Sequence, residues 1–308
     1  MLSNDSSRGK WRDSDSDLFN RAIHLYENAN FKEARAIFEH LYNKQSEEVE
    51  DWHLLQWIGE CSYYMGDSEN AILVSKKALD MLPSDLDSDL FILRIMNILA
   101  LSYYVEADFH HSIEYYNLAE EYLENYGRPD YPTSRYLFRL GKGRCLFYLG
   151  SYKMADVQFK KAIDEVRNIE PFEDDKIGNE HRCNLIYFEL MRNCLHMGEL
   201  NSAEDYSQKI ETSELEENFW GDYFYYFLKI QFLNSNYSKI MAFYDTQVEK
   251  YIDRKHKQEY YFILGAAFFQ NGEFEISKDL LIKAKNVSTT NSKLSREISE
   301  YLVKIEER

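Results

Sequence analysis

Cations gather in one segment of an otherwise acidic chain. Arg128–Arg167 holds nine Arg and Lys residues against four Asp and Glu residues, a local balance of +5, whereas the 308-residue chain has a formal net charge of −17. The aromatic pair Phe147–Tyr148 lies in the same segment. An Arg side chain can hold a carboxylate through two parallel hydrogen bonds, and an aromatic ring supplies rigid contact area. These residue types predict recognition of an extended peptide that has acidic groups or a free carboxylate.

The sequence contains no set of residues suited to catalysis or to metal binding. Gly141 and Gly143 form a GKG sequence inside an expected helix, without the preceding strand of a phosphate-binding or dinucleotide-binding loop. His110 and His111 are adjacent, so they point to different faces of a helix, whereas two metal ligands on one helix need i, i+4 spacing. We therefore expect a non-enzymatic protein with no catalytic residues, no metal site and no cofactor.

The cysteines and the termini indicate a compartment. Cys61, Cys145, Cys183 and Cys194 form no CxxC pair, and each lies in an apolar helical stretch, where a free cysteine behaves as a small buried hydrophobe. The N-terminus lacks the apolar core of a signal peptide, and no window approaches the ~20 apolar residues of a membrane span. We expect a cytoplasmic protein.

The net charge limits the partners. A charge of −17 opposes nonspecific binding to nucleic acid and to anionic membranes, and its ordinary role is solubility. We therefore expect a protein or peptide partner, with no nucleic acid and no membrane, for a chain that is a monomer or a weak dimer.

The elements that position these residues are amphipathic helices in pairs. The stretch Trp52–Pro83 has the pattern of two helices joined by a short turn. Gly59 lies in the first helix and Ala71 lies twelve residues later in the second, and small residues allow two helices to pack closely. The chain has only 12 Gly and 4 Pro, few helix breakers for its length, so we expect an all-helical protein.

The twelve-residue gap between small residues recurs along the chain, in the pairs Ala22/Ala34, Ala100/Ser112, Gly143/Ala155 and Gly265/Ser277. Two further copies are degenerate. In the fifth copy Met191 replaces the first small residue, although Ala203 is in place, and in the sixth copy Leu228 and Ile240 replace both small residues. The turns NANF, MGDS, LGSY, MGEL, NSNY and NGEF precede second helices, and we expect Asn or Gly to supply their left-handed backbone.

This pattern resembles the tetratricopeptide repeat (TPR) family, over about Asp17–Asn286. Successive copies are offset by 37, 41, 43, 48, 37 and 37 residues, longer than the ordinary repeat, and such long repeats look like those of kinesin light chains and Rap-type regulators. The resemblance implies an all-α, right-handed α–α superhelix of about seven helical hairpins. We expect a flexible tail over residues 1–13, the solenoid over 14–286 and a C-terminal capping helix over 287–308.

The resemblance also implies which residues line the concave groove: those just after the small residue, three before it, and four or five after it. The residue just after it is a cation in three consecutive copies, and we call Arg144, Arg192 and Lys229 the cation row. The predicted partner-binding residues are Arg94, Asn97, Tyr104, Arg144, Phe147, Tyr148, Arg192 and Lys229.

Two interpretations of the cation row stay open. It lines a groove that binds a peptide or partner segment, or it pairs internally with acidic residues of the next repeat. The leading function is a peptide-binding scaffold. The alternatives are a regulator that changes conformation when a peptide binds, and a structural subunit of a larger complex held by its convex face.

Overall fold

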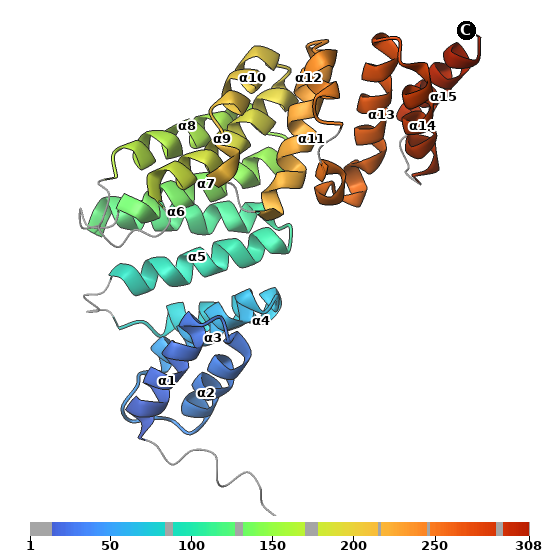
Figure 1. Ribbon diagram of the computed structural model, residues 1–308. Coiled ribbons are helices and arrows are strands. Elements are labelled where there is room, and N and C mark those ends of the chain that lie inside the picture. The colour runs from blue at the N-terminus through green and yellow to red at the C-terminus, as the bar shows by residue number, and fades with distance from the viewer. Residues whose placement is uncertain are drawn as a thin grey trace, which may run out of the picture. The chain divides into compact units, whose positions relative to one another are not determined.

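The chain forms helices throughout the part that the computed structural model describes, which is residues 14–83, 89–126, 132–169, 178–214, 217–244, 247–287 and 292–307 (Figure 1). The expected flexible tail, residues 1–13, lies outside these ranges. The chain divides into two compact units, Met1–Glu165 and Val166–Arg308, and each is described here by itself.

The N-terminal unit consists of helices in consecutive pairs, each joined by a short turn. Its helices are α1 (Asp15–Glu27), α2 (Phe31–Asn43), α3 (Asp51–Tyr64), α4 (Ser68–Asp80), α5 (Asp89–Val105), α6 (Phe109–Tyr126), α7 (Pro132–Tyr148) and α8 (Tyr152–Arg167), the last of which contains the boundary.

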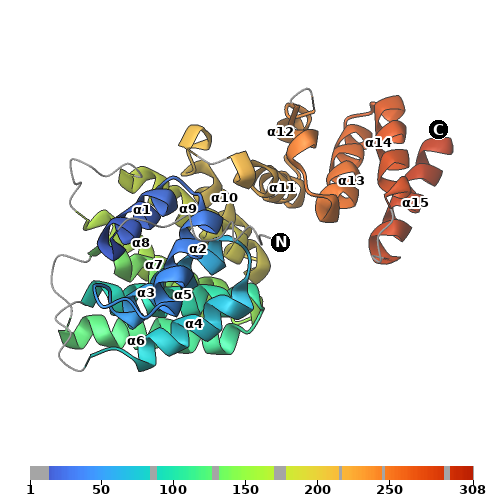
Figure 2. The same cartoon turned by 90° about the horizontal axis from the view of Figure 1, so that it is seen from below.

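The C-terminal unit continues the pattern, and its last three helices lie side by side (Figure 2). Its elements are α9 (Gly178–Met197), α10 (Leu200–Gln208), the 3₁₀ turn η1 (Thr212–Glu214), α11 (Glu217–Leu233), α12 (Tyr237–Met241), the 3₁₀ turn η2 (Gln247–Tyr251), α13 (Arg254–Gln270), α14 (Phe274–Asn286) and α15 (Ser292–Glu306).

Close packing at the small residues holds the regular pairs together, as the sequence predicts. A Cβ atom added to Gly59 would lie 2.4 Å from Ser75 Oγ, and one added to Gly143 would lie 2.4 Å from the Phe159 ring. Where the second small residue is a serine, its hydroxyl crosses back to the first helix. Ser112 Oγ donates to the carbonyl of Ala100 at 2.7 Å, and Ser277 Oγ donates to that of Gly265 at 2.8 Å.

The turns confirm one half of the expectation about left-handed backbone and correct the other. The turn glycines do adopt positive φ, as Gly66 does at 80°. In the turns without glycine, however, the positive-φ residues are Ala29 and Ser235 rather than asparagine. The way the helix ends determines which residue has positive φ. The backbone N–H of the next residue donates to the carbonyl five residues earlier, as Asn30 N does to Leu25 O at 2.8 Å.

The sixth pair differs from the others in the length of its second helix. α12 has only five residues, whereas α14 has thirteen. The chain leaves α12 through tighter i→i+3 bonds, from Phe243 N to Ile240 O at 3.1 Å and from Tyr244 N to Met241 O at 3.0 Å. Ile240, which replaces the small residue, is fully buried.

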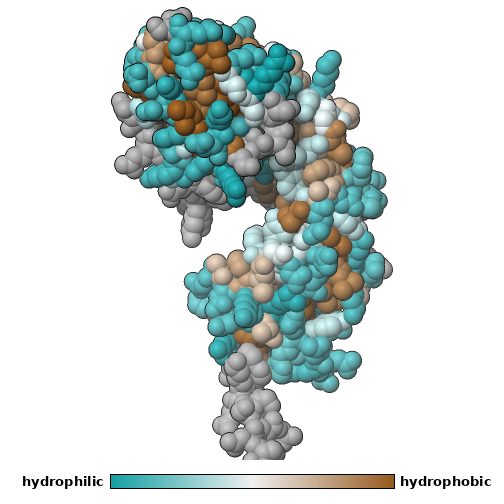
Figure 3. Space-filling model, turned by 90° about the vertical axis from the view of Figure 1, so that its right-hand side faces the viewer, coloured by the Kyte–Doolittle hydropathy of each residue, from teal (hydrophilic) through white to brown (hydrophobic). Residues whose placement is uncertain are grey.

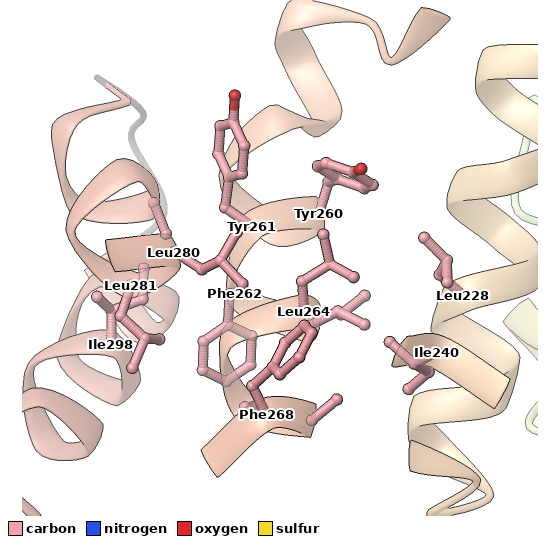
Figure 4. Close-up of a cluster of buried hydrophobic side chains, with 14 of the residues drawn as sticks. Leu228, Ile240, Tyr260, Tyr261, Phe262, Leu264, Phe268, Leu280, Leu281 and Ile298 are labelled. Carbon is pink, nitrogen blue, oxygen red and sulfur yellow. The ribbon is translucent and has the colours of Figure 1, made fainter. Parts of the chain in front are cut away.

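The C-terminal core is continuous from α11 to α15. Figure 4 shows Leu228 and Ile240 on one side of α13 and Leu281 and Ile298 on the other side. Ile298 of α15 has no exposed surface, so α15 covers the outer face of the last pair as a capping helix does. Across the described part of the chain, no helix has the length and apolar character needed to cross a membrane.

Burial protects the cysteine thiols, and this gives a first prediction. Cys61, Cys145 and Cys194 are buried, whereas Cys183 is half-buried. Burial raises the pKa of Cys61 to about 12 and also raises the pKa of Cys145 and of Cys183. Because the thiolate is the reactive form, we expect iodoacetamide to modify Cys183 of the native protein first, with the buried cysteines at least about tenfold slower. Peptide mass spectrometry measures each site.

The unfolded protein is the control for this labelling, since all four thiols should then react at similar rates. Native Cys61 reacting as fast as native Cys183 would contradict the prediction.

Candidate functional site

A hollow of about 100 Å³ lies among α5, α6 and α7 of the N-terminal unit. It brings together three of the predicted partner-binding residues, Asn97 and Tyr104 from α5 and Arg144 from α7. Among the described residues that line it, none is acidic. The hollow therefore combines a guanidinium, an amide and the phenols of Tyr104 and Tyr116 with apolar residues.

Helix geometry explains how these side chains meet. Asn97, Leu101 and Tyr104 lie four and three residues apart, so they share one face of α5. Gly141 of α7 faces Tyr116 of α6, and a Cβ atom there would lie only 2.2 Å from Tyr116 Cζ. The glycine thus lets the phenol ring lie directly against α7 and form one wall of the hollow.

The positive charge of Arg144 acts on two nearby phenols. Burial raises the pKa of Tyr116 and of Tyr63, while the positive charge of Arg144 acts in the opposite direction on both. The two phenols stay protonated at neutral pH and remain hydrogen-bond donors. A protonated phenol beside a guanidinium suits an anionic ligand.

Aromatic rings adjoin the hollow. The Tyr104 ring centroid lies 5.7 Å from that of Phe109 and 5.8 Å from that of Tyr148. Phe109 and Tyr148 stack at 5.3 Å, and Phe147 meets Tyr148 edge-on at 5.5 Å. Tyr148 is 51% exposed, whereas Phe147 is buried. The structure therefore gathers Tyr104, Phe147 and Tyr148 into one cluster with an accessible ring.

Sequence reasoning missed Phe109 as a member of this cluster. A signal existed, because an aromatic residue begins the second helix in several pairs: Phe31, Phe109, Tyr152, Tyr237 and Phe274. Phe31 stacks on Tyr64 at 4.8 Å in the same way that Phe109 stacks on Tyr148.

Arg94 is held by an internal carboxylate. Its Nε and Nη2 donate to the two carboxylate oxygens of Glu60 at 2.9 and 2.7 Å, and its guanidinium lies 4.4 Å from the Trp57 ring centroid. Glu60 also accepts from Tyr26 Oη at 2.7 Å and from Gln56 Nε2 at 2.9 Å. This partly buried network joins the first helices of three successive pairs.

Two members of the cation row, Arg192 and Lys229, lie in the C-terminal unit. Each of them has an acidic partner, as Arg94 does. Arg192 Nη2 lies 2.7 Å from Glu189 Oε2, and both side chains are buried. Lys229 Nζ lies 3.0 Å from Glu259 Oε1, and Tyr225 Oη donates to Glu259 Oε2 at 2.6 Å. Internal pairing thus accounts for the charges of Arg192 and Lys229, as for that of Arg94. Whether any of them contacts a ligand stays a prediction.

Two of these ion pairs, Glu60–Arg94 and Lys229–Glu259, follow a common register. Glu60 and Lys229 each directly follow the small-residue position of their own pair, and Arg94 and Glu259 each lie six residues before that of the next pair. The two ion pairs therefore occupy the same two repeat positions with the charges exchanged. The first position is acidic in one pair and basic in the other. Arg192 and Asp222 occupy the same register, and Arg192 helps His256 to lower the pKa of Asp222.

No family model matches the chain, and no curated protein sequence matches it. Solved structures do match. The apo form of RapI is 12% identical, with 94% of this chain and 99% of that chain covered and a TM-score of 0.60. The C-terminal part of a TPR repeat-containing protein from Cytophaga hutchinsonii is 15% identical, with 90% and 97% covered and a TM-score of 0.57. The chain has the tetratricopeptide-repeat fold.

This result confirms the all-α class of paired helices that the small-residue spacing and the resemblance predict. A chain from the hetero-tetramer Cut9–Hcn1 also matches at 14% identity and a TM-score of 0.51, with 93% of this chain and 49% of that chain covered. At such identities the similarity establishes the fold alone.

Proposed function

We propose that this chain is a non-enzymatic protein-interaction scaffold and that the hollow among α5, α6 and α7 binds a peptide or partner segment. The observation that supports this most directly is the meeting of Asn97, Tyr104 and Arg144 in a hollow whose described lining has no acidic residue. The TPR fold supports the class of function, since the Cut9–Hcn1 chain that matches comes from an assembly of two different proteins.

The chemistry of the hollow favours a carboxylate. Arg144 supplies a guanidinium that can hold an acidic side chain or a free C-terminus through two hydrogen bonds. Asn97 can both donate to and accept from a peptide main chain. The exposed Tyr148 ring, with Tyr104 beside it, supplies contact area for an apolar side chain next to that carboxylate.

Replacing Arg144 by glutamine tests this assignment. Peptides are selected on the wild-type protein from a random library with free C-termini, and the best binder is measured by fluorescence polarisation. We expect Arg144→Gln to weaken that binder by about tenfold, because a charge-assisted carboxylate contact is lost.

The matched control is Arg135→Gln, which removes an exposed cation from the same helix outside the hollow. Its affinity should stay at the wild-type value. Equal weakening by both variants would show a general charge effect, and no weakening by Arg144→Gln would place the peptide elsewhere. Small-angle X-ray scattering with and without the peptide then separates a static scaffold from a peptide-responsive regulator.

A further inference from the structure

A second cavity, of about 430 Å³, lies in the C-terminal unit and is independent of the proposed peptide site. Segments η1, α11 and η2 line this open cavity, and its walls include Thr212, Ser213, Trp220, Phe224, Lys250 and Tyr251. Apolar side chains also reach the surface of this unit, as the brown areas among the C-terminal helices at the top of Figure 3 show. A cavity of this size falls within the range of small-molecule sites.

The shortened α12 explains why the cavity exists. α11 has seventeen residues but α12 only five, so α12 does not cover the first half of α11, where Trp220 and Phe224 lie (Figure 1). The chain returns to that half as η2 instead. The backbone of Tyr251 lies so close to Gly221 that a Cβ atom there would be 1.9 Å from the Tyr251 carbonyl oxygen. This contact fixes one wall of the cavity.

The lining combines aromatic rings with a single charge. The Trp220 and Tyr251 rings meet edge-on at 5.1 Å. Of the described residues that line the cavity, Lys250 alone is charged, and its Nζ lies 4.5 Å from the Tyr251 ring centroid. The nearby Glu249 carboxylate is directed to other groups, since Tyr261 Oη donates to it at 2.6 Å. The hydroxyls of Thr212 and Ser213 add two hydrogen-bonding groups.

We propose that this cavity binds a small aromatic anion, with its ring system against Trp220 and Phe224 and its anionic group at Lys250. A flat ring can pack against the three aromatic rings of the walls, Trp220, Phe224 and Tyr251, since rings pack favourably edge-to-face or offset. The cation on Lys250 selects an anion over a neutral or cationic analogue. Residues from three separate segments can contact the ligand, as in a small-molecule site.

Two dyes with closely related ring systems test the proposal. The probe is 8-anilinonaphthalene-1-sulfonate, and its uncharged analogue is N-phenyl-1-naphthylamine. We expect the sulfonate to bind saturably at one site and more tightly than the amine. Lys250→Gln should weaken the sulfonate by about fivefold, the modest effect of a solvent-exposed charge, and leave the amine unchanged.

Lys283→Gln is the matched control, because Lys283 also lies over a tyrosine ring, at 5.6 Å from Tyr261, but outside the cavity. Ser213→Trp, at an exposed position, should fill the entrance and abolish binding of both dyes. Trp220→Phe should reduce energy transfer from tryptophan to the bound dye while the affinity measured by direct excitation persists.

Three results would overturn the proposal. Absence of saturable binding would exclude a ligand cavity, and equal affinity of the two dyes would exclude an anion site. Sulfonate binding that is unchanged by both Lys250→Gln and Ser213→Trp would place the dye elsewhere on the protein. Circular dichroism of the two variants, both at exposed positions, verifies that they remain helical.

Discussion

Glu60→Ala is expected to lower the free energy of unfolding of the N-terminal unit by about 3 kcal/mol. Glu60 is 3% exposed and accepts hydrogen bonds from Arg94, Tyr26 and Gln56. Alanine leaves the Arg94 guanidinium without its carboxylate and leaves a buried amide and a phenol without their acceptor. Arg94 retains 31% side-chain exposure, so water offsets part of its loss, and we expect the lower end of the effect of breaking a buried pair.

Urea denaturation followed by tryptophan fluorescence measures this loss, since Trp57 lies under the Arg94 guanidinium. The control is Glu39→Ala, which removes a carboxylate from a more exposed i, i+4 pair with Arg35 and should cost no more than about 0.5 kcal/mol. The double variant Glu60→Ala/Arg94→Ala should regain part of the stability, because no orphan charge remains. A loss for Glu60→Ala no larger than that for Glu39→Ala would refute the buried network.

Local rules in the sequence predicted most of the fold. Close helix packing requires small residues, so the spacing from Gly59 to Ala71 and from Gly143 to Ala155 indicated paired helices before any contact was known. The five-residue α12 could not be predicted from that spacing, since its end depends on how Ile240 packs and where the chain turns back toward α11. The positive φ at Ala29 was missed for a related reason, because the end of α1 rather than residue preference determines it.

The candidate site shows the same limit. The register placed Asn97, Tyr104 and Arg144 at positions that share one hollow, although their binding role remains a proposal. The register did not reveal that the carboxylate of Glu259 approaches Lys229 from the next pair, 30 residues later. Such partners become visible only when helices from successive pairs are placed together. In this chain, two such ion pairs use the same two positions with the signs of the charges exchanged.

Gly221→Ala is expected to destabilise the C-terminal unit by about 3 kcal/mol, at the upper end of overpacking effects. The added methyl group would lie 1.9 Å from the carbonyl oxygen of Tyr251 and 2.8 Å from its carbonyl carbon. A side chain could rotate away from such a contact, but these are backbone atoms, so η2 as a whole must move. Differential scanning calorimetry and urea denaturation of the full chain measure the loss.

Gly59→Ala is the graded comparison for this prediction. Its added methyl would lie 2.4 Å from Ser75 Oγ, a hydroxyl that can rotate, and alanine favours a helix over glycine by about 1 kcal/mol, so the net loss should be about 1 kcal/mol or less. Because η2 forms a wall of the C-terminal cavity, Gly221→Ala should also weaken dye binding, whereas Gly59→Ala should not. Equal stability of Gly221→Ala and the wild type would mean that η2 does not lie against α11 in solution.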